Sequence, residues 1–139
     1  MIRLKIKLTL PYPPSELLPN RHTHWSVKAK ATRKARKDAY YEARNQAHSE
    51  SFATALPEPM ESVALDITFY PPKGRVADMD GLYAAFKPCL DSLVDAKIIK
   101  DDSPKVIKLV NLHVGSKSDN PRTEITVSEL DNILPSSYT

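Results

Sequence analysis

Cysteine is almost missing from the sequence, and no long run of apolar residues is present. Cys89 is the only cysteine among 139 residues, which excludes an internal disulfide and a cysteine-based zinc site within one chain. No apolar stretch approaches the roughly 20 residues that a membrane span requires. The first residues alternate charged and apolar side chains, unlike the apolar stretch of a signal peptide. We therefore expect a soluble protein of a reducing, cytoplasmic compartment, with no membrane partner.

The chain also has little net charge, since 20 Lys and Arg against 17 Asp and Glu give only +3 at pH 7. This value alone is weak evidence for a nucleic-acid partner. The distribution of the charges says more, because residues 21–44 are mainly basic whereas acidic residues gather between 78 and 102. Such a separation favours a protein that neutralises phosphate with one surface and coordinates a metal ion with another.

Length and composition predict one globular domain, with 41% apolar and 27% charged residues. Alternating or β-branched segments predict strands, and proline-bearing segments predict the loops between them. The expected strands are 2–10, 63–70, 106–114 and 123–130. We expect the domain to cover residues 1–130 and residues 131–139 to form a loose tail.

Two helices are expected between these strands. The first covers 27–48, with Ser26 as its N-cap, and small residues recur at every fourth position along one side. These are Val27, Ala31, Ala35, Ala39, Ala43 and Ala47. The second covers 79–96, where Pro88 requires a kink or a restart. Its apolar side carries Leu82, Phe86, Cys89, Leu90 and Leu93, so Cys89 is expected to be a buried apolar residue and not a nucleophile.

The element order β-α-β-α-β-β predicts a small α+β domain, a mixed four-stranded sheet with two main helices on one face. Residues 115–121 combine glycine, serine, asparagine and proline, a composition typical of a hairpin turn. We therefore expect the last two strands to be joined as a hairpin.

Asp78 and Asp80, together with the pair Asp101-Asp102, are the candidates for a metal site. Mg²⁺ takes octahedral oxygen ligation at about 2.1 Å and keeps several waters, so two or three carboxylates plus a substrate phosphate satisfy it. The alternative for Asp-x-Asp before a helix is a role as caps or solvated acids, which is more common.

Helix geometry adds Lys87 and Asp91 to this cluster. At about 100° per residue, both fall within about 20° of Asp80 on one helix face, opposite the apolar side. A lysine facing metal-bound carboxylates can stabilise the charge that develops on a scissile phosphate. The alternative is a simple Lys87–Asp91 surface ion pair.

These motifs, in this order, resemble the RusA family of Holliday-junction resolvases. The matching segments are Asp78-Met79-Asp80-Gly81-Leu82, Lys87-Pro88-Cys89-Leu90-Asp91-Ser92-Leu93 and Ile98-Ile99-Lys100-Asp101-Asp102, and the proline-rich Leu10-Pro11-Tyr12-Pro13-Pro14-Ser15 with Asn20. The resemblance covers about Leu8 to Val127. It implies that Asp78, Asp80 and Asp102 bind the catalytic Mg²⁺, which Mn²⁺ can replace, and that Lys87 is the catalytic lysine.

Two features depart from the family pattern. Gly81 stands where many members have asparagine. The segment from Asp80 to Lys87 is about one helical turn longer than in shorter members, which moves Lys87 along the helix axis.

Basic and aromatic residues before and between the acids are candidates for DNA contacts. They are Asn20, Arg21, His24, Trp25, Lys28, Lys30, Arg33, Lys37, Lys73 and Arg75. For the helical residues, the alternative is a solvated face without function. Trp25 stacks on an unpaired base or, as is more common for tryptophan, anchors in the core. His22 and His24 lack the neighbouring acids that a metal site would need.

The sequence thus predicts a Mg²⁺-dependent endodeoxyribonuclease. The resemblance implies paired nicks across a four-way junction by a homodimer, in DNA recombination and repair. Two alternatives remain open: a non-catalytic DNA-binding module, and a metal-dependent nuclease of flaps or duplex DNA. The participation of Asp91 and Asp101 also remains open.

Overall fold

A computed structural model describes residues 2–19, 21–49 and 58–131 of the chain. The elements follow in the order β1 (Ile2–Pro11), the short 3-10 helix η1 (Ser15–Leu17), α1 (Trp25–Ser49), β2 (Val63–Tyr70), α2 (Met79–Ala85), α3 (Lys87–Asp95), β3 (Ile107–Val114) and β4 (Arg122–Leu130). The predicted α+β class is confirmed. The predicted tail, apart from Asp131, lies outside the described residues.

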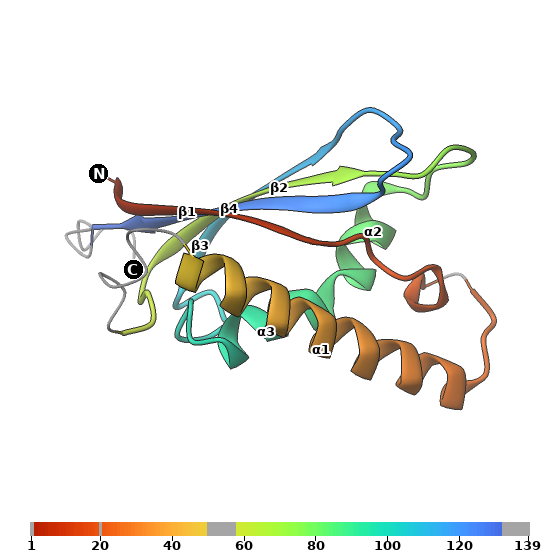
Figure 1. Cartoon of the computed structure of the whole chain (residues 1–139), viewed down its shortest axis with the longest axis horizontal. Coiled ribbons are helices and arrows are strands. Elements are labelled where there is room, and N and C mark those ends of the chain that lie inside the picture. Colours follow the sequence, from red (N-terminus) through yellow and green to blue (C-terminus); the bar gives the residue numbers. More distant parts are fainter. Residues whose placement is uncertain (1, 20, 50–57, 132–139) are drawn as a thin grey trace.

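The four strands form one mixed sheet in the order β1-β4-β2-β3, and α1 and α3 lie on the same face of it (Figure 1). β4 runs antiparallel to both β1 and β2, whereas β3 runs parallel to β2. None of the described helices is long and apolar enough to cross a membrane.

The predicted hairpin between the last two strands is wrong, because β3 pairs with β2 and not with β4. The segment from β2 through α2 and α3 to β3 is a crossover between parallel strands, which needs a helical connection and places β3 beside β2. Residues 115–121 then pass back over β2, where Gly115 and Ser118 donate hydrogen bonds to the carbonyls of Phe69 and Pro71.

The small-residue side of α1 packs against the domain along most of its length. Ala35, Ala39, Ala43 and Ala47 are buried, but Val27 is 45% exposed because the first turns of α1 extend beyond the packed part. The predicted start is also corrected, since the helix begins at Trp25 and not after Ser26. His24 caps it, because its Nδ1 accepts a hydrogen bond of 3.1 Å from the Ser26 amide and its carbonyl accepts the Val27 and Lys28 amides.

The predicted break at Pro88 is confirmed, since α2 ends at Ala85 and α3 begins at Lys87 with proline in its first turn. The predicted apolar side of both helices is buried, and Phe86 packs edge-to-face on Phe69 with ring centroids 5.7 Å apart. Burial raises the pKa of the Cys89 thiol to about 12. This residue is therefore part of the core and not a nucleophile.

Gly115 lies against the ring of Tyr70, on which the Arg122 guanidinium stacks 4.2 Å from the ring centroid. A Cβ at Gly115 would come within 2.5 Å of that ring. We expect Gly115→Ala to lower the free energy of unfolding by about 1–3 kcal/mol, since the aromatic ring must shift. Thermal denaturation measures the loss, and Tyr70→Ala is the control background. If Gly115→Ala lowers the free energy of unfolding by the same amount in the Tyr70→Ala background, the contact with the Tyr70 ring is not the cause of the loss.

Candidate active site

Asp78 and Asp80 flank the start of α2, and neither side chain bonds to any described residue. Asp78 has extended backbone angles, and its carbonyl accepts the Leu82 amide at 3.0 Å, while its side chain makes no cap hydrogen bond. The alternative role of Asp78 as a side-chain cap is therefore wrong. Both side chains are exposed. Two neighbouring carboxylates without a compensating partner favour the binding of a cation.

An open pocket of about 590 Å³ contains both of these aspartates. It lies between η1 and the loop that leads into α2, and Arg21 and Arg75 line it as well. Neither arginine forms an ion pair with a described residue, so both guanidinium groups are available to an anion. The pocket thus brings predicted metal ligands and predicted phosphate contacts into one place.

Gly81 lines the same pocket. A Cβ added there would lie 3.8 Å from side-chain atoms of Leu18 and Pro19, which is ordinary van der Waals contact. The segment after η1 therefore leaves room for a Cβ at this position.

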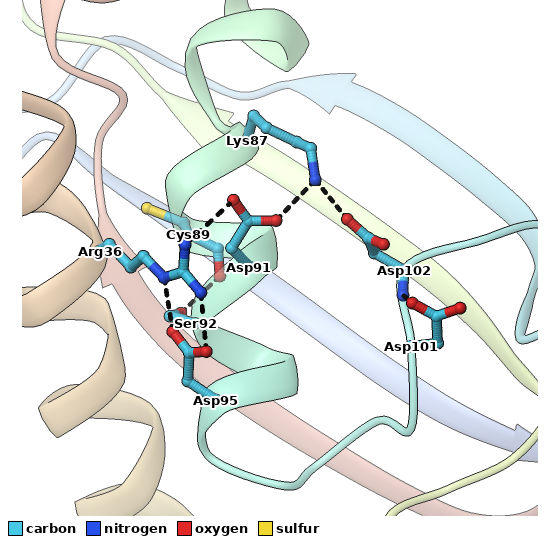
Figure 2. A network of polar contacts seen from close by, with 8 residues as sticks. All are labelled: Arg36, Lys87, Cys89, Asp91, Ser92, Asp95, Asp101 and Asp102. Carbon is cyan, nitrogen blue, oxygen red and sulfur yellow. Dashed lines mark hydrogen bonds and ion pairs between the residues drawn. The ribbon is translucent and has the colours of Figure 1, made fainter. Parts of the chain in front are cut away.

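Lys87 lies between two carboxylates, as Figure 2 shows. Its Nζ donates a hydrogen bond of 2.5 Å to Asp91 Oδ1 and another to Asp102 Oδ2. These bonds, first that to Asp102 and then that to Asp91, raise the pKa of Lys87 above its usual value. The bond from Lys87 in turn lowers the pKa of Asp102. Lys87 and Asp102, both predicted from the sequence, are thus in direct contact.

The break between α2 and α3 changes the predicted geometry of this lysine. The expectation that Asp80, Lys87 and Asp91 share one face applies 100° per residue along one continuous helix, whereas the chain restarts at Lys87. Within α3 the expectation holds, and Lys87 and Asp91 form the i, i+4 pair. Between Lys87 and Asp80, both among the described residues, no hydrogen bond or ion pair forms.

Arg36 on α1 extends this network and was missed as a site residue by the sequence reasoning. It donates hydrogen bonds of 2.6 and 2.8 Å to the two oxygens of Asp95, and its Nη1 lies 3.8 Å from Asp91 Oδ2 (Figure 2). In the sequence it is one of several basic residues in a helix. Only the packing of α1 on α3 distinguishes it.

Oxygen donors of the kind that Mg²⁺ prefers are present, but they are divided between two places. Within residues 2–19, 21–49 and 58–131, no three His, Cys, Asp or Glu side chains form a group that could hold a metal ion. Tyr83, three residues after Asp80, lies within the electrostatic influence of Lys87 and Asp102. Burial raises its pKa, while the charge of Lys87 lowers it and that of Asp102 raises it. Asp78 and Asp80 therefore offer two carboxylates in one pocket, whereas Asp102 lies apart from that pocket and is held by Lys87.

The predicted DNA-contact residues lie mostly on exposed surface. Lys30, Arg33 and Lys37 are exposed on α1 and have no ion-pair partner in the described part of the chain, whereas Lys28 is half-buried. Lys73 lies 3.3 Å from Asp119 in an exposed ion pair. Asn20 lies outside the described residues.

Trp25 is 75% exposed, so the alternative of a core anchor is wrong. Its ring lies beside that of His24 with centroids 5.6 Å apart. The first turn of α1 therefore presents an aromatic surface to solvent.

No family model matches the chain. A protein of Xylella fastidiosa (strain Temecula1 / ATCC 700964), described as an uncharacterized protein, is 40% identical over 95 residues. The match covers 68% of this chain and 59% of the Xylella protein. The chain thus spans about three fifths of the length of this relative.

Proposed function

We propose that the chain is a Mg²⁺-dependent endonuclease that cuts branched DNA and belongs to the RusA-type resolvases. One observation carries the proposal: Asp78 and Asp80, without partners among the described residues, share a pocket with Arg21 and Arg75. A phosphodiester brings a negative charge and needs a divalent cation for its hydrolysis, and this pocket offers binding groups for both.

Each residue of the proposed site has a separate task. Asp78 and Asp80 hold Mg²⁺, which when bound supplies Lewis-acid polarisation of the phosphate and a more acidic water. Arg21 and Arg75 bind the phosphate oxygens and orient the strand. Lys87 stabilises negative charge that develops on the phosphate or the leaving oxygen. The resemblance to the RusA family adds Asp102, which would contribute a third carboxylate.

The preference for a four-way junction and the homodimer rest on the resemblance to the RusA family. A twofold dimer has two equivalent active sites and so suits a substrate with twofold symmetry. The exposed Trp25 supports a branched substrate, because unpaired bases at a branch point can stack on an aromatic ring.

A gel assay with labelled four-way junction, flap and linear duplex, each with Mg²⁺ or with EDTA, tests the proposal directly. We expect Mg²⁺-dependent paired nicks in the junction and bound but uncut junction in Ca²⁺ or EDTA, since lysine and arginine supply the phosphate contacts. Undiminished cutting in EDTA would contradict the metal mechanism. Faster cutting of flaps or duplex than of the junction would favour the alternative of a flap or duplex nuclease. Binding without cutting would favour the non-catalytic DNA-binding module.

The exposed basic residues of α1 lead to a prediction for DNA binding. Replacing Lys30, Arg33 and Lys37 together with alanine should weaken junction binding and reduce the slope of log Kobs against log salt by up to about 3, because fewer counterions are released. Binding is measured at several salt concentrations in Ca²⁺. The control variant replaces Lys5, Lys7 and Lys108, which are exposed on strands β1 and β3. Equal slopes in the two variants would show that this face of α1 does not contact DNA.

A further inference from the structure

His24 and Trp25 form an exposed pair of aromatic rings at the start of α1, the end of this helix that lies farther from the sheet (Figure 1). The ring centroids are 5.6 Å apart, and the ring planes are inclined by 32°. Trp25 is 75% exposed, and its indole N–H has no hydrogen-bond partner in the described part of the chain. Most of the indole surface therefore faces solvent and contributes little to the core.

Hydrogen bonds hold the histidine of this pair in place. Its Nδ1 accepts a hydrogen bond of 3.1 Å from the Ser26 amide and lies 2.7 Å from the Ser26 hydroxyl. Its carbonyl oxygen accepts the amides of Val27 and Lys28 at 3.0 and 3.1 Å. A ring that is held in place before binding loses little conformational freedom when a planar ligand stacks beside it. His24 thus supplies a fixed ring next to the exposed indole.

The charges around the ring pair have one sign. No Asp or Glu occurs between Glu16 and Asp38 in the sequence. An apolar protein segment stacked on Trp25 would leave the basic residues of this stretch without a counter-charge, whereas an unpaired nucleic-acid strand offers both phosphates and exposed aromatic faces. The cations that have no ion-pair partner among the described residues are Arg21, Lys28, Lys30, Arg33 and Lys37.

We propose that the ring pair of His24 and Trp25 is a stacking site for one unpaired base of a DNA strand, whose phosphates bind to the surrounding cations. Every base has an aromatic face, so stacking tolerates any base sequence. Inside a duplex, neighbouring base pairs cover both faces of a base, and none is left for Trp25. The site therefore distinguishes a branch or a single strand from intact duplex. This inference rests on the proposed function for the branched substrate and adds the contact that recognises the branch.

The ring pair is close along the chain to the pocket of Asp78 and Asp80. Arg21, which lines this pocket, precedes Trp25 by four residues. Four residues span at most about 14 Å even when the chain is fully extended. A base on Trp25 and a phosphate at Arg21 therefore belong to nearby nucleotides of one strand. Stacking of an unpaired base thus brings a neighbouring phosphate within reach of the pocket.

Trp25 is the only tryptophan of the chain, so intrinsic tryptophan fluorescence reports on this site alone. The parent is titrated in EDTA with an oligothymidine single strand and, separately, with a blunt duplex of the same length. We expect the single strand to quench the emission, because the indole stacks on a base, and the duplex to leave it nearly unchanged at saturation. Unchanged emission at saturating single strand, or equal quenching by the duplex, overturns the proposal. Emission that changes with protein concentration in the absence of DNA would show a contact between two copies and also overturn it.

A substitution at Trp25 tests the contribution of the ring to affinity, measured by the fluorescence anisotropy of labelled DNA. Trp25→Leu keeps an apolar side chain but lacks an aromatic face. We expect it to bind oligothymidine about tenfold more weakly than the parent and to bind the duplex like the parent. Trp25→Phe should keep most of the affinity for the single strand. An equal loss of affinity for single strand and duplex in Trp25→Leu overturns the proposal.

The matched control is Tyr41→Leu, which removes another exposed aromatic ring from α1. Tyr41 is 51% exposed, but it lies between Asp38 and Glu42 in the sequence. We expect this variant to bind oligothymidine like the parent, and a loss equal to that of Trp25→Leu would overturn the assignment to the ring pair. Quenching by the single strand in a parent that cuts no DNA overturns the proposed function alone. Cutting of the junction without such quenching overturns this inference alone.

Discussion

Asp102→Asn is expected to bind a four-way junction at least as tightly as the parent and to cleave it at least about a hundredfold more slowly. The rate loss corresponds to about 2.7 kcal/mol in transition-state stabilisation. Asparagine is nearly isosteric with aspartate but lacks the anionic oxygen that a hard cation requires. The lost charge also removes a repulsion of the phosphate backbone, so affinity should hold or increase.

The neighbouring acid provides the control for this variant. The Asp101 side chain accepts a hydrogen bond of 2.8 Å from the Asp102 amide and is exposed, and Asp102 alone of the two contacts Lys87. Asp101→Asn should therefore have the milder effect. Single-turnover cleavage in Mg²⁺ and binding in Ca²⁺ are measured for both variants. A severe loss in Asp101→Asn with near-parental cleavage by Asp102→Asn would mean that the two roles are exchanged, and full activity of both variants would contradict the three-aspartate site.

Local patterns in the sequence were sufficient to predict which segments form strands and helices. Period-two alternation marked β1, and the period-four alanines marked the buried side of α1 from Ala35 onward. Pro88 marked the break between α2 and α3, since proline in a helix interior clashes with the preceding turn. These features depend on residues close in the sequence, which is why sequence alone predicted them.

Strand pairing and the start of α1 could not be predicted in the same way. The composition of residues 115–121 specifies a turn but not the partner of the strand that follows, and β4 pairs with β1 and β2. The N-cap of α1 was missed because a histidine ring nitrogen accepts the hydrogen bond that serine usually accepts.

Sequence reasoning named candidate site residues, but it predicted only part of the contacts between them. Motif spacing pointed to Asp78, Asp80, Lys87 and the pair Asp101-Asp102, and the resemblance to the RusA family selected Asp102. Of these residues, Lys87 and Asp102 are in contact. The assumption of one continuous helix placed Lys87 beside Asp80, whereas the restart at Lys87 joins it to Asp102. Arg36 depends on the contact between α1 and α3, which residues far apart in the sequence create. The spacing of residues within one helix cannot predict such a contact between two helices.

The remaining pair of carboxylates should separate activity from stability most clearly. Asp78→Asn combined with Asp80→Asn is expected to reduce the rate of junction cleavage at least about a thousandfold, a loss of about 4 kcal/mol, because both proposed metal ligands lose their anionic oxygens. The melting temperature should not fall. Neither side chain bonds to a described residue, and the double substitution removes the repulsion between two neighbouring negative charges.

The matched control for this double variant is Asp38→Asn with Asp66→Asn, which changes the net charge equally at a distance from the pocket. Asp38 pairs with Lys34 on α1, and Asp66 accepts a hydrogen bond of 3.1 Å from Asn111 on the sheet. The control should cleave at the parental rate and melt slightly lower, because it loses one ion pair and weakens one hydrogen bond. The site variant is thus expected to lose cleavage rate but not stability, and the control variant to lose a little stability but not cleavage rate. A site variant that melts well below the parent, or that cleaves within tenfold of it, would show that Asp78 and Asp80 serve the fold and not the cleavage of DNA.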